Sequence, residues 1–196
     1  MTPGLRKLGL TLHVVLSVGW SGAVAAFVAL AIGTFSKDAA LAHASYLTMA
    51  VVGRGVLVPL SIGALLSGIV QSLATKWGLF RHYWLLVKLA LTLFATAALL
   101  VHQATAIAEA ASLAREASGV LLHSAQLHQL GVQLLADSGL ALLVLLTVTT
   151  IAFYKPWGLI GQITRGLKVF IAGVTALVVA FVALHLSGHG MHRHNH

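Results

Sequence analysis

The 196-residue chain contains no cysteine, three prolines, three methionines and only four carboxylates. The absence of cysteine excludes disulfides, thiolate-bound metals, iron–sulfur clusters held by cysteine, and cysteine nucleophiles. Charged residues make up 8% of the chain and hydrophobic residues 59%, whereas an ordinary soluble domain is roughly 25% charged. The composition therefore excludes a soluble globular domain and a disordered chain, and it predicts a protein that lies in a lipid bilayer.

Basic residues outnumber acidic ones, with 12 Lys and Arg against four Asp and Glu. The bases flank apolar segments and do not cluster on one soluble face, so we interpret them as membrane anchors and expect no nucleic-acid partner. No carboxylate lies in the middle of an apolar run, and Asp137 is expected at the start of a span. A buried carboxylate pair for hydrolysis is therefore not expected. Eleven histidines supply most of the polar chemistry of the chain.

Five apolar stretches are long enough to cross the hydrocarbon core, which takes about 20 helical residues. They are Leu8–Phe35, Val52–Ala74, Tyr83–His102, Val132–Tyr154 and Leu167–Leu186. We predict an all-α membrane protein, a four-helix transmembrane bundle plus a fifth transmembrane helix, in one domain over residues 1–187. Residues 104–131 are expected to form an outer amphipathic connection that caps the bundle, and residues 188–196 form a His-rich tail.

The distribution of bases predicts the orientation. With the N-terminus inside, seven Lys and Arg fall on the inner side, namely Arg6, Lys7, Lys76, Arg81, Lys155, Arg165 and Lys168, and four fall outside. Because cytoplasmic loops carry an excess of Lys and Arg, we expect an inner or plasma membrane location with the N-terminus cytoplasmic and the C-terminus outside. Small residues four positions apart, such as Gly63 with Ser67 and Ala64 with Gly68, predict close helix contacts.

Ionisable side chains inside the spans are functional candidates because they are costly to insert. His13 and Lys88 lie at a similar depth from the inner side, on different helices, and can face each other. His102, His128, His185 and Arg54 lie near the outer ends of the spans. Imidazoles with a nearby cation suit a b-type haem, and imidazole suits copper and zinc equally. Structural roles stay open, since Lys88 can snorkel to the headgroups and the histidines can be solvated interface residues.

The C-terminal tail is a separate candidate. It contains four histidines at irregular spacing: His189, His192, His194 and His196. Short His-rich tracts bind copper, nickel or zinc, so the tail is a candidate metal site for copper or zinc. The alternative is a disordered polar end.

Two sequence motifs carry a resemblance to a known family. The first span contains Leu12-His13 and, after six residues, Trp20-Ser21-Gly22; the third span contains Trp84-Leu85-Leu86-Val87-Lys88-Leu89. Over roughly residues 8–154 this pairing resembles the superfamily that includes bacterial copper-resistance protein D and the haem-containing membrane protoporphyrinogen oxidase, and it looks closest to an uncharacterised integral-membrane branch. The resemblance implies haem b in a four-helix bundle, with His13 and Lys88 as the functional pair.

The leading hypothesis is a membrane-embedded protein that binds b-type haem for electron transfer or redox chemistry. Its cofactor ligands and neighbours would be His13, Lys88, His102, His128, His185 and Arg54. Whether such a protein is a haem-dependent oxidoreductase stays open. The alternatives are a copper or other transition-metal transporter or sensor, and an accessory subunit of a membrane complex, with a membrane-protein partner or a homodimer.

Overall fold

The structure is a computed structural model that describes residues 2–74, 82–116 and 125–154, together with positions 168, 169, 172, 173 and 176. Its regular elements over residues 3–154, outside the gaps 75–81 and 117–124, are all helical: α1 (Pro3–Gly33), α2 (Ala39–Val52), η1 (Gly53–Leu57), α3 (Val58–Ala74), α4 (Tyr83–Ala98), η2 (Leu99–Gln103), α5 (Ala104–Glu116) and α6 (Ala125–Tyr154). The elements η1 and η2 are π-helical turns.

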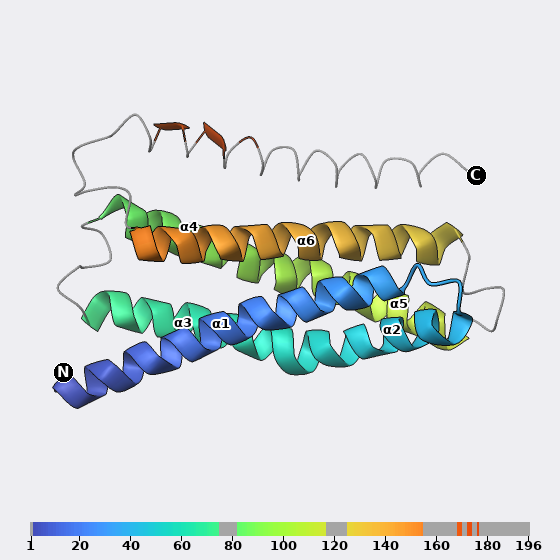
Figure 1. Ribbon diagram of the computed structural model, residues 1–196, viewed down its shortest axis with the longest axis horizontal. Coiled ribbons are helices and arrows are strands. Elements are labelled where there is room, and N and C mark those ends of the chain that lie inside the picture. Colours follow the sequence, from blue (N-terminus) through green and yellow to red (C-terminus); the bar gives the residue numbers. More distant parts are fainter. Residues whose placement is uncertain are drawn as a thin grey trace.

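These elements form four long helical columns, shown in Figure 1: α1, α2–η1–α3, α4–η2–α5, and α6. Each column is long and apolar enough to cross a membrane. The described part of the chain is therefore all-helical, and its four columns are those of a multi-pass membrane protein, as the composition predicts. The predicted fifth span, Leu167–Leu186, and the His-rich tail lie outside the continuously described residues.

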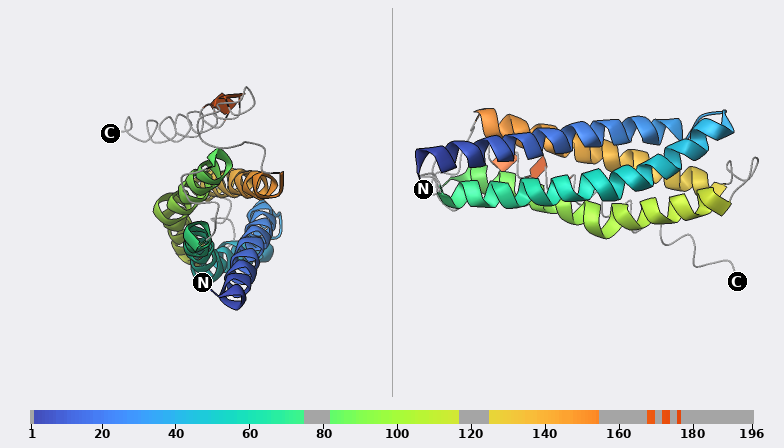
Figure 2. Two further views of the ribbon diagram at one scale, coloured as in Figure 1. Left: turned by 90° about the vertical axis from the view of Figure 1, so that its left-hand side faces the viewer. Right: turned by 90° about the horizontal axis from the view of Figure 1, so that it is seen from below.

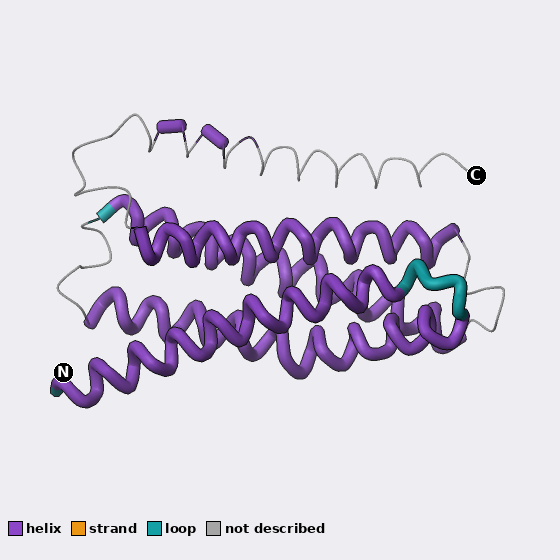
Figure 3. Tube along the Cα trace, viewed as in Figure 1, coloured by secondary structure: helices purple, strands orange, loops and turns teal. Residues whose placement is uncertain are grey.

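The columns run alternately up and down, and seen end-on they surround one interior (Figure 2). We call the end of the bundle that carries the N-terminus the near end. The opposite end, which carries the connection from Thr34 to Asp38 between α1 and α2, is the far end (Figure 3). In the near half α1 packs against α3 and α6, and α4 also packs against α3 and α6. In the far half α1 packs against α2, and α5 packs against α2 and α6.

Local sequence signals account for the helix ends. At the start of α1, Pro3 occupies the first turn, where its missing N–H costs nothing, and the Thr2 hydroxyl accepts a hydrogen bond from the Leu5 N–H at 3.4 Å. Asp38 caps α2 through its carboxylate, which accepts from the Ala40 N–H at 2.9 Å. The Thr34–Asp38 turn is therefore closed by polar side chains that satisfy free backbone groups.

The second and third columns are longer than the spans expected from hydropathy. The second begins at Ala39 and not at Val52, so Arg54 lies within the continuous helix, in η1, and is exposed. In the third column η2 joins α4 to α5 without a break, and α5 packs against α2 and α6. Residues Ala104–Glu116 thus extend a membrane-length helix, where the sequence predicts a separate amphipathic cap. A helix can absorb one extra residue in a π turn and continue, and hydropathy gives no signal of this.

The tightest packing lies in the far half. The largest side chains with under 2% exposure include Phe27, Met49, Leu57, Leu127 and Leu134. Tyr46 donates its hydroxyl to the Leu127 carbonyl at 2.8 Å and joins α2 to α6. A Cβ atom at Gly131 would lie 2.9 Å from the Thr34 hydroxyl oxygen and 3.0 Å from that of Tyr46, so glycine permits this close approach. The far half is thus a closed core.

Candidate functional site

His13 of α1 and Lys88 of α4 meet in the near half of the bundle. The Lys88 Nζ atom lies 3.3 Å from the His13 Nε2 atom. Both side chains are half-buried, although each belongs to a helix that is long enough to cross the bilayer. The expected meeting of these two groups is present in the structure. An amine and an imidazole in such a position are costly to insert, so they form a candidate functional site.

Ser67 of α3 completes this polar group. Its Oγ atom lies 3.0 Å from His13 Nδ1 and 3.2 Å from the Ala64 carbonyl oxygen, to which it donates. An ammonium has no acceptor, so Lys88 donates to Nε2, and the ring proton then lies on Nδ1 and is donated to Ser67. The result is a directed chain of hydrogen bonds, Lys88 to His13 to Ser67 to the Ala64 carbonyl, which we call the polar chain. It joins three helices.

The polar chain faces a small cavity. The cavity measures about 30 Å³ and is lined by His13, Lys88, Gly68, Ser72 and Thr92, with apolar neighbours from α3 and α4. This volume holds one or two water molecules. A Cβ atom at Gly68 would lie 3.1 Å from the Cε1 atom of His13, so the imidazole ring rests against the glycine. Close packing and hydrogen bonds therefore both restrict the orientation of the ring.

The residues at this place do not fit a haem b between His13 and Lys88. Pockets that hold ligands of that size measure about 300–1,000 Å³, whereas the cavity between these side chains measures about 30 Å³. Both ring nitrogens of His13 also bond to protein groups, and Nε2, the candidate iron ligand, faces Lys88 directly. A porphyrin between them would require α1 and α4 to move apart.

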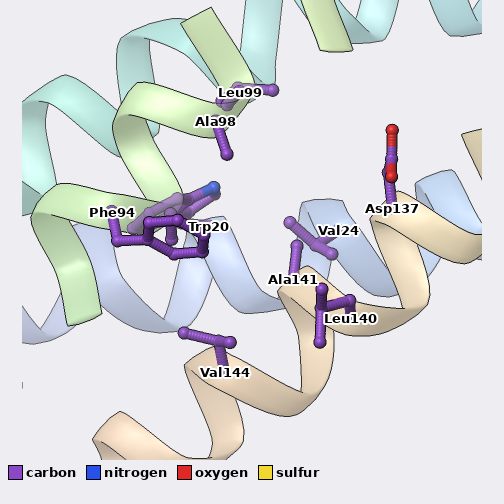
Figure 4. A pocket seen from close by; sticks show the side chains of 10 residues that line it. Trp20, Val24, Phe94, Ala98, Leu99, Asp137, Leu140, Ala141 and Val144 are labelled. Atoms are coloured by element: carbon purple, nitrogen blue, oxygen red, sulfur yellow. The ribbon is translucent and has the colours of Figure 1, made fainter. Parts of the chain in front are cut away.

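A second interior cavity of about 40 Å³ lies farther along the bundle, between α1, the α4–η2 junction and α6. Trp20 and Phe94 line one side of it and Asp137 lies at the other (Figure 4). Asp137 lies well inside the helix Ala125–Tyr154, because α6 begins seven residues before the expected span. Its carboxylate thus belongs to a membrane-length helix that starts before the expected start of the span at Val132.

The predicted outer residues that the structure describes lie on three different elements. His128 is exposed and packs edge-on against Phe35, with ring centroids 5.3 Å apart. Arg54 is exposed on η1, and His102 lies in η2. His185 and the tail histidines His189, His192, His194 and His196 fall outside the described residues. Among the positions that the structure describes, no three His, Cys, Asp or Glu side chains are grouped to hold a metal ion.

Two functional candidates are not predicted as such by the sequence. The sequence predicts Ser67 only as a small residue at a helix contact. That contact between α3 and α1 is confirmed: Gly63 faces Leu16, and Gly68 faces His13. The second role of Ser67, as the hydrogen-bond partner of His13, depends on the rotation of α3. Asp137 is assigned to a helix end by hydropathy. The sequence gives one indication of a role for Asp137, which is that a carboxylate beside an apolar run is a functional candidate.

No family model matches this chain, and neither a curated protein nor a solved structure is similar to it.

Proposed function

We propose that this protein transfers protons through the membrane, with Lys88, His13 and Ser67 as the proton-carrying groups of the near half. The observation that carries the proposal is the 3.3 Å contact between the Lys88 amine and the His13 imidazole inside membrane-length helices. Both groups bind and release protons, and ionisable residues inside membrane helices mark proton relays. The adjoining cavity of about 30 Å³ admits water and excludes larger substrates.

The two interior cavities together outline a path along the bundle. On α1, Trp20 lies seven residues beyond His13, which is about 10 Å along the helix axis. On α4, Thr92 lines the first cavity and Ala95 lines the second, as does Leu99 at the start of η2. The path thus runs from an amine and an imidazole in the near half to the Asp137 carboxylate in the far half, through two water-sized spaces of about 30 and 40 Å³. Rearrangement of side chains between the two spaces would gate it.

The redox hypothesis uses the same residues. Its support is the family resemblance of the His13 and Lys88 motifs, and binding of haem b would need the helices to part. Its test is separate: a pyridine haemochrome spectrum and elemental analysis of one purified preparation. A Soret band that is lost in a His13→Leu variant would support the haem hypothesis, and copper or zinc at the tail would be seen as metal content that falls when residues 188–196 are removed.

We further propose that the N-terminus is cytoplasmic and that Leu167–Leu186 is a fifth membrane helix, which would put the C-terminus outside. The support is the excess of Lys and Arg at the near-end loops. In this orientation the polar chain takes protons from the cytoplasmic side, and the Asp137 cavity lies toward the outside. Protease protection of tags placed at each terminus in sealed vesicles tests both points.

The test of proton transfer uses purified protein in liposomes that enclose a pH-sensitive dye. A potassium gradient with valinomycin sets the interior negative, and the initial acidification rate is measured. We expect the wild-type rate to exceed that of protein-free liposomes by at least about fivefold, because a buried relay replaces the bilayer barrier. Lys88→Met, His13→Leu and Asp137→Asn should each lower the rate to within about twofold of the protein-free value.

Matched controls remove an exposed charge of the same kind. Lys7→Met on α1 and Glu109→Gln on α5 change exposed side chains that line neither interior cavity, and both should keep the wild-type rate. Size-exclusion chromatography shows which variants fold. Wild-type liposomes that acidify no faster than protein-free ones would refute the proposal, and equal rates in wild type and Lys88→Met would show that the polar chain has a structural role only.

A further inference from the structure

A groove between α1 and α3 opens on the outer surface of the near half. It measures about 360 Å³ and is lined on α1 by Leu5, Arg6, Gly9, Leu12 and Leu16, and on α3 by Gly63, Leu66, Ser67, Val70 and Gln71. Its apolar walls include side chains that are more than half exposed, such as Leu12 at 53% and Leu66 at 57%. In a membrane these side chains face acyl chains, so the groove is open to lipid.

Two polar groups lie at the near end of this groove. Arg6 is exposed on α1. The Gln71 side-chain nitrogen is buried, and it has no hydrogen-bond partner within the part of the chain that the structure describes. A Cβ atom at Gly9 would lie 3.3 Å from this nitrogen, so the Gln71 amide lies against α1 one turn beyond Arg6. An amide N–H in apolar surroundings needs an acceptor, and the groove is where one can approach.

From these features we infer that the groove binds one phospholipid with an anionic headgroup. Arg6 and Gly9 are three residues apart, which is about 4.5 Å along the helix axis. The polar region of each leaflet is about 5–7 Å deep, since a bilayer of 40–45 Å has a hydrocarbon core of about 30 Å. With the Arg6 guanidinium at the level of the phosphate, this spacing puts the Gln71 amide at the level of the ester carbonyls.

The chemistry of each level matches this ligand. A guanidinium binds phosphate oxygens through paired N–H donors and is repelled by the ammonium of a zwitterionic headgroup, so an anionic headgroup is preferred. The Gln71 amide donates to an ester carbonyl. Beyond Gln71, the side chains of Leu12, Leu66 and Val70 contact the acyl chain. Ser67 also lines the groove, so a bound acyl chain covers the Ser67 end of the polar chain on its lipid side. The lipid would in this way separate the polar chain from the bilayer.

The experiment is native mass spectrometry of the purified full-length protein, released from detergent after incubation with equimolar dioleoyl phosphatidylglycerol and dioleoyl phosphatidylcholine. We expect one phosphatidylglycerol to be retained, at least about fivefold over phosphatidylcholine. Arg6→Gln and Gln71→Leu should each reduce its retention by about tenfold. Arg6→Lys, which keeps the charge but loses the paired donors, should give an intermediate value.

Lys7→Gln is the matched control, because Lys7 is an exposed neighbour of Arg6 that does not line the groove. Retention that is unchanged in Lys7→Gln supports a specific site. Equal loss in Lys7→Gln and Arg6→Gln would overturn the inference, since the effect would then be surface charge. Equal retention of the two lipids would also overturn the inference, and so would unchanged retention in both Arg6→Gln and Gln71→Leu. A third contrary result would be displacement of the lipid by one equivalent of a short-chain quinone.

Discussion

The near and far halves of the bundle are built on opposite principles. In the far half, Phe27, Met49 and Leu134 are almost completely buried, and Tyr46 ties two helices together. In the near half the helices hold an amine and an imidazole, a cavity beside them and a groove open to lipid. The closest packing therefore lies around Phe27, Met49 and Leu134, and this core offsets the cost of His13 and Lys88 in the near half and of Asp137 beside the second cavity.

The largest expected effect is overpacking of the far half at Gly131. A leucine at this position would place its Cβ about 3 Å from the hydroxyl oxygens of Thr34 and Tyr46, and its further atoms have no space. We expect Gly131→Leu to lower the free energy of unfolding by about 3 kcal/mol, because the helices must separate and the Tyr46 hydrogen bond is lost. Denaturation of the protein in mixed micelles, followed by circular dichroism, measures this loss.

The same helix offers the control. A Cβ at Gly139 would meet no atom within 4 Å, so Gly139→Ala should keep or raise stability, since alanine favours helix. A Gly131→Leu variant that is as stable as Gly139→Ala would show that the far half is not closely packed around Gly131.

A smaller effect is expected from the polar chain in the near half. Lys88→Met leaves the His13 Nε2 atom without its donor, and His13→Leu leaves the Lys88 amine without its acceptor. When both groups are replaced, neither is left unpaired. We therefore expect the double variant to be more stable than the sum of the single variants predicts, with a coupling free energy of about 1 kcal/mol. The measurement is a double-mutant cycle of unfolding in the same micelles.

Tyr154→Phe supplies the control for additivity. Tyr154 is 80% exposed at the end of α6, so combining Tyr154→Phe with Lys88→Met should give additive effects within about 0.5 kcal/mol. A coupling of zero between positions 13 and 88 would contradict the hydrogen bond between them. A coupling of about 3 kcal/mol would equal the loss of stability expected for Gly131→Leu. The polar chain would then stabilise the protein as much as the packing of the far half does.

The sequence predicts the fold class and the centre of the site for a physical reason. A long apolar run is stable as a helix that crosses the hydrocarbon core, so the four membrane-length helices follow from hydropathy alone. The cost of ionisable groups in lipid singles out His13 and Lys88 in the same way. These features depend on composition and depth, which a sequence states directly.

Other features depend on rotation and packing, which a sequence does not state. The π turns η1 and η2 extend two columns beyond the hydropathic boundaries and place Arg54 within a helix. Ser67 joins the polar chain because α3 turns that side toward α1, although its spacing alone indicates a packing residue. Asp137 lies inside α6 because the helix begins among polar residues before the apolar run.

The smallest expected effect on stability, and the sharpest on geometry, is at Gly68. An added Cβ would lie 3.1 Å from the Cε1 atom of His13, so in Gly68→Ala the imidazole ring must shift by a few tenths of an ångström. The better helix propensity of alanine offsets most of the crowding, and we expect unfolding to change by less than about 1 kcal/mol. The ring nitrogens should still respond, because a displaced ring changes its distances to Lys88 and Ser67. Their ¹⁵N resonances in histidine-labelled protein in bilayers should therefore move in Gly68→Ala and stay in place in Gly22→Ala, since a Cβ at Gly22 meets no atom within 4 Å. Unmoved resonances in Gly68→Ala would mean that the ring is not held against α3, and the near half would then lack the fixed geometry on which a directed proton path depends.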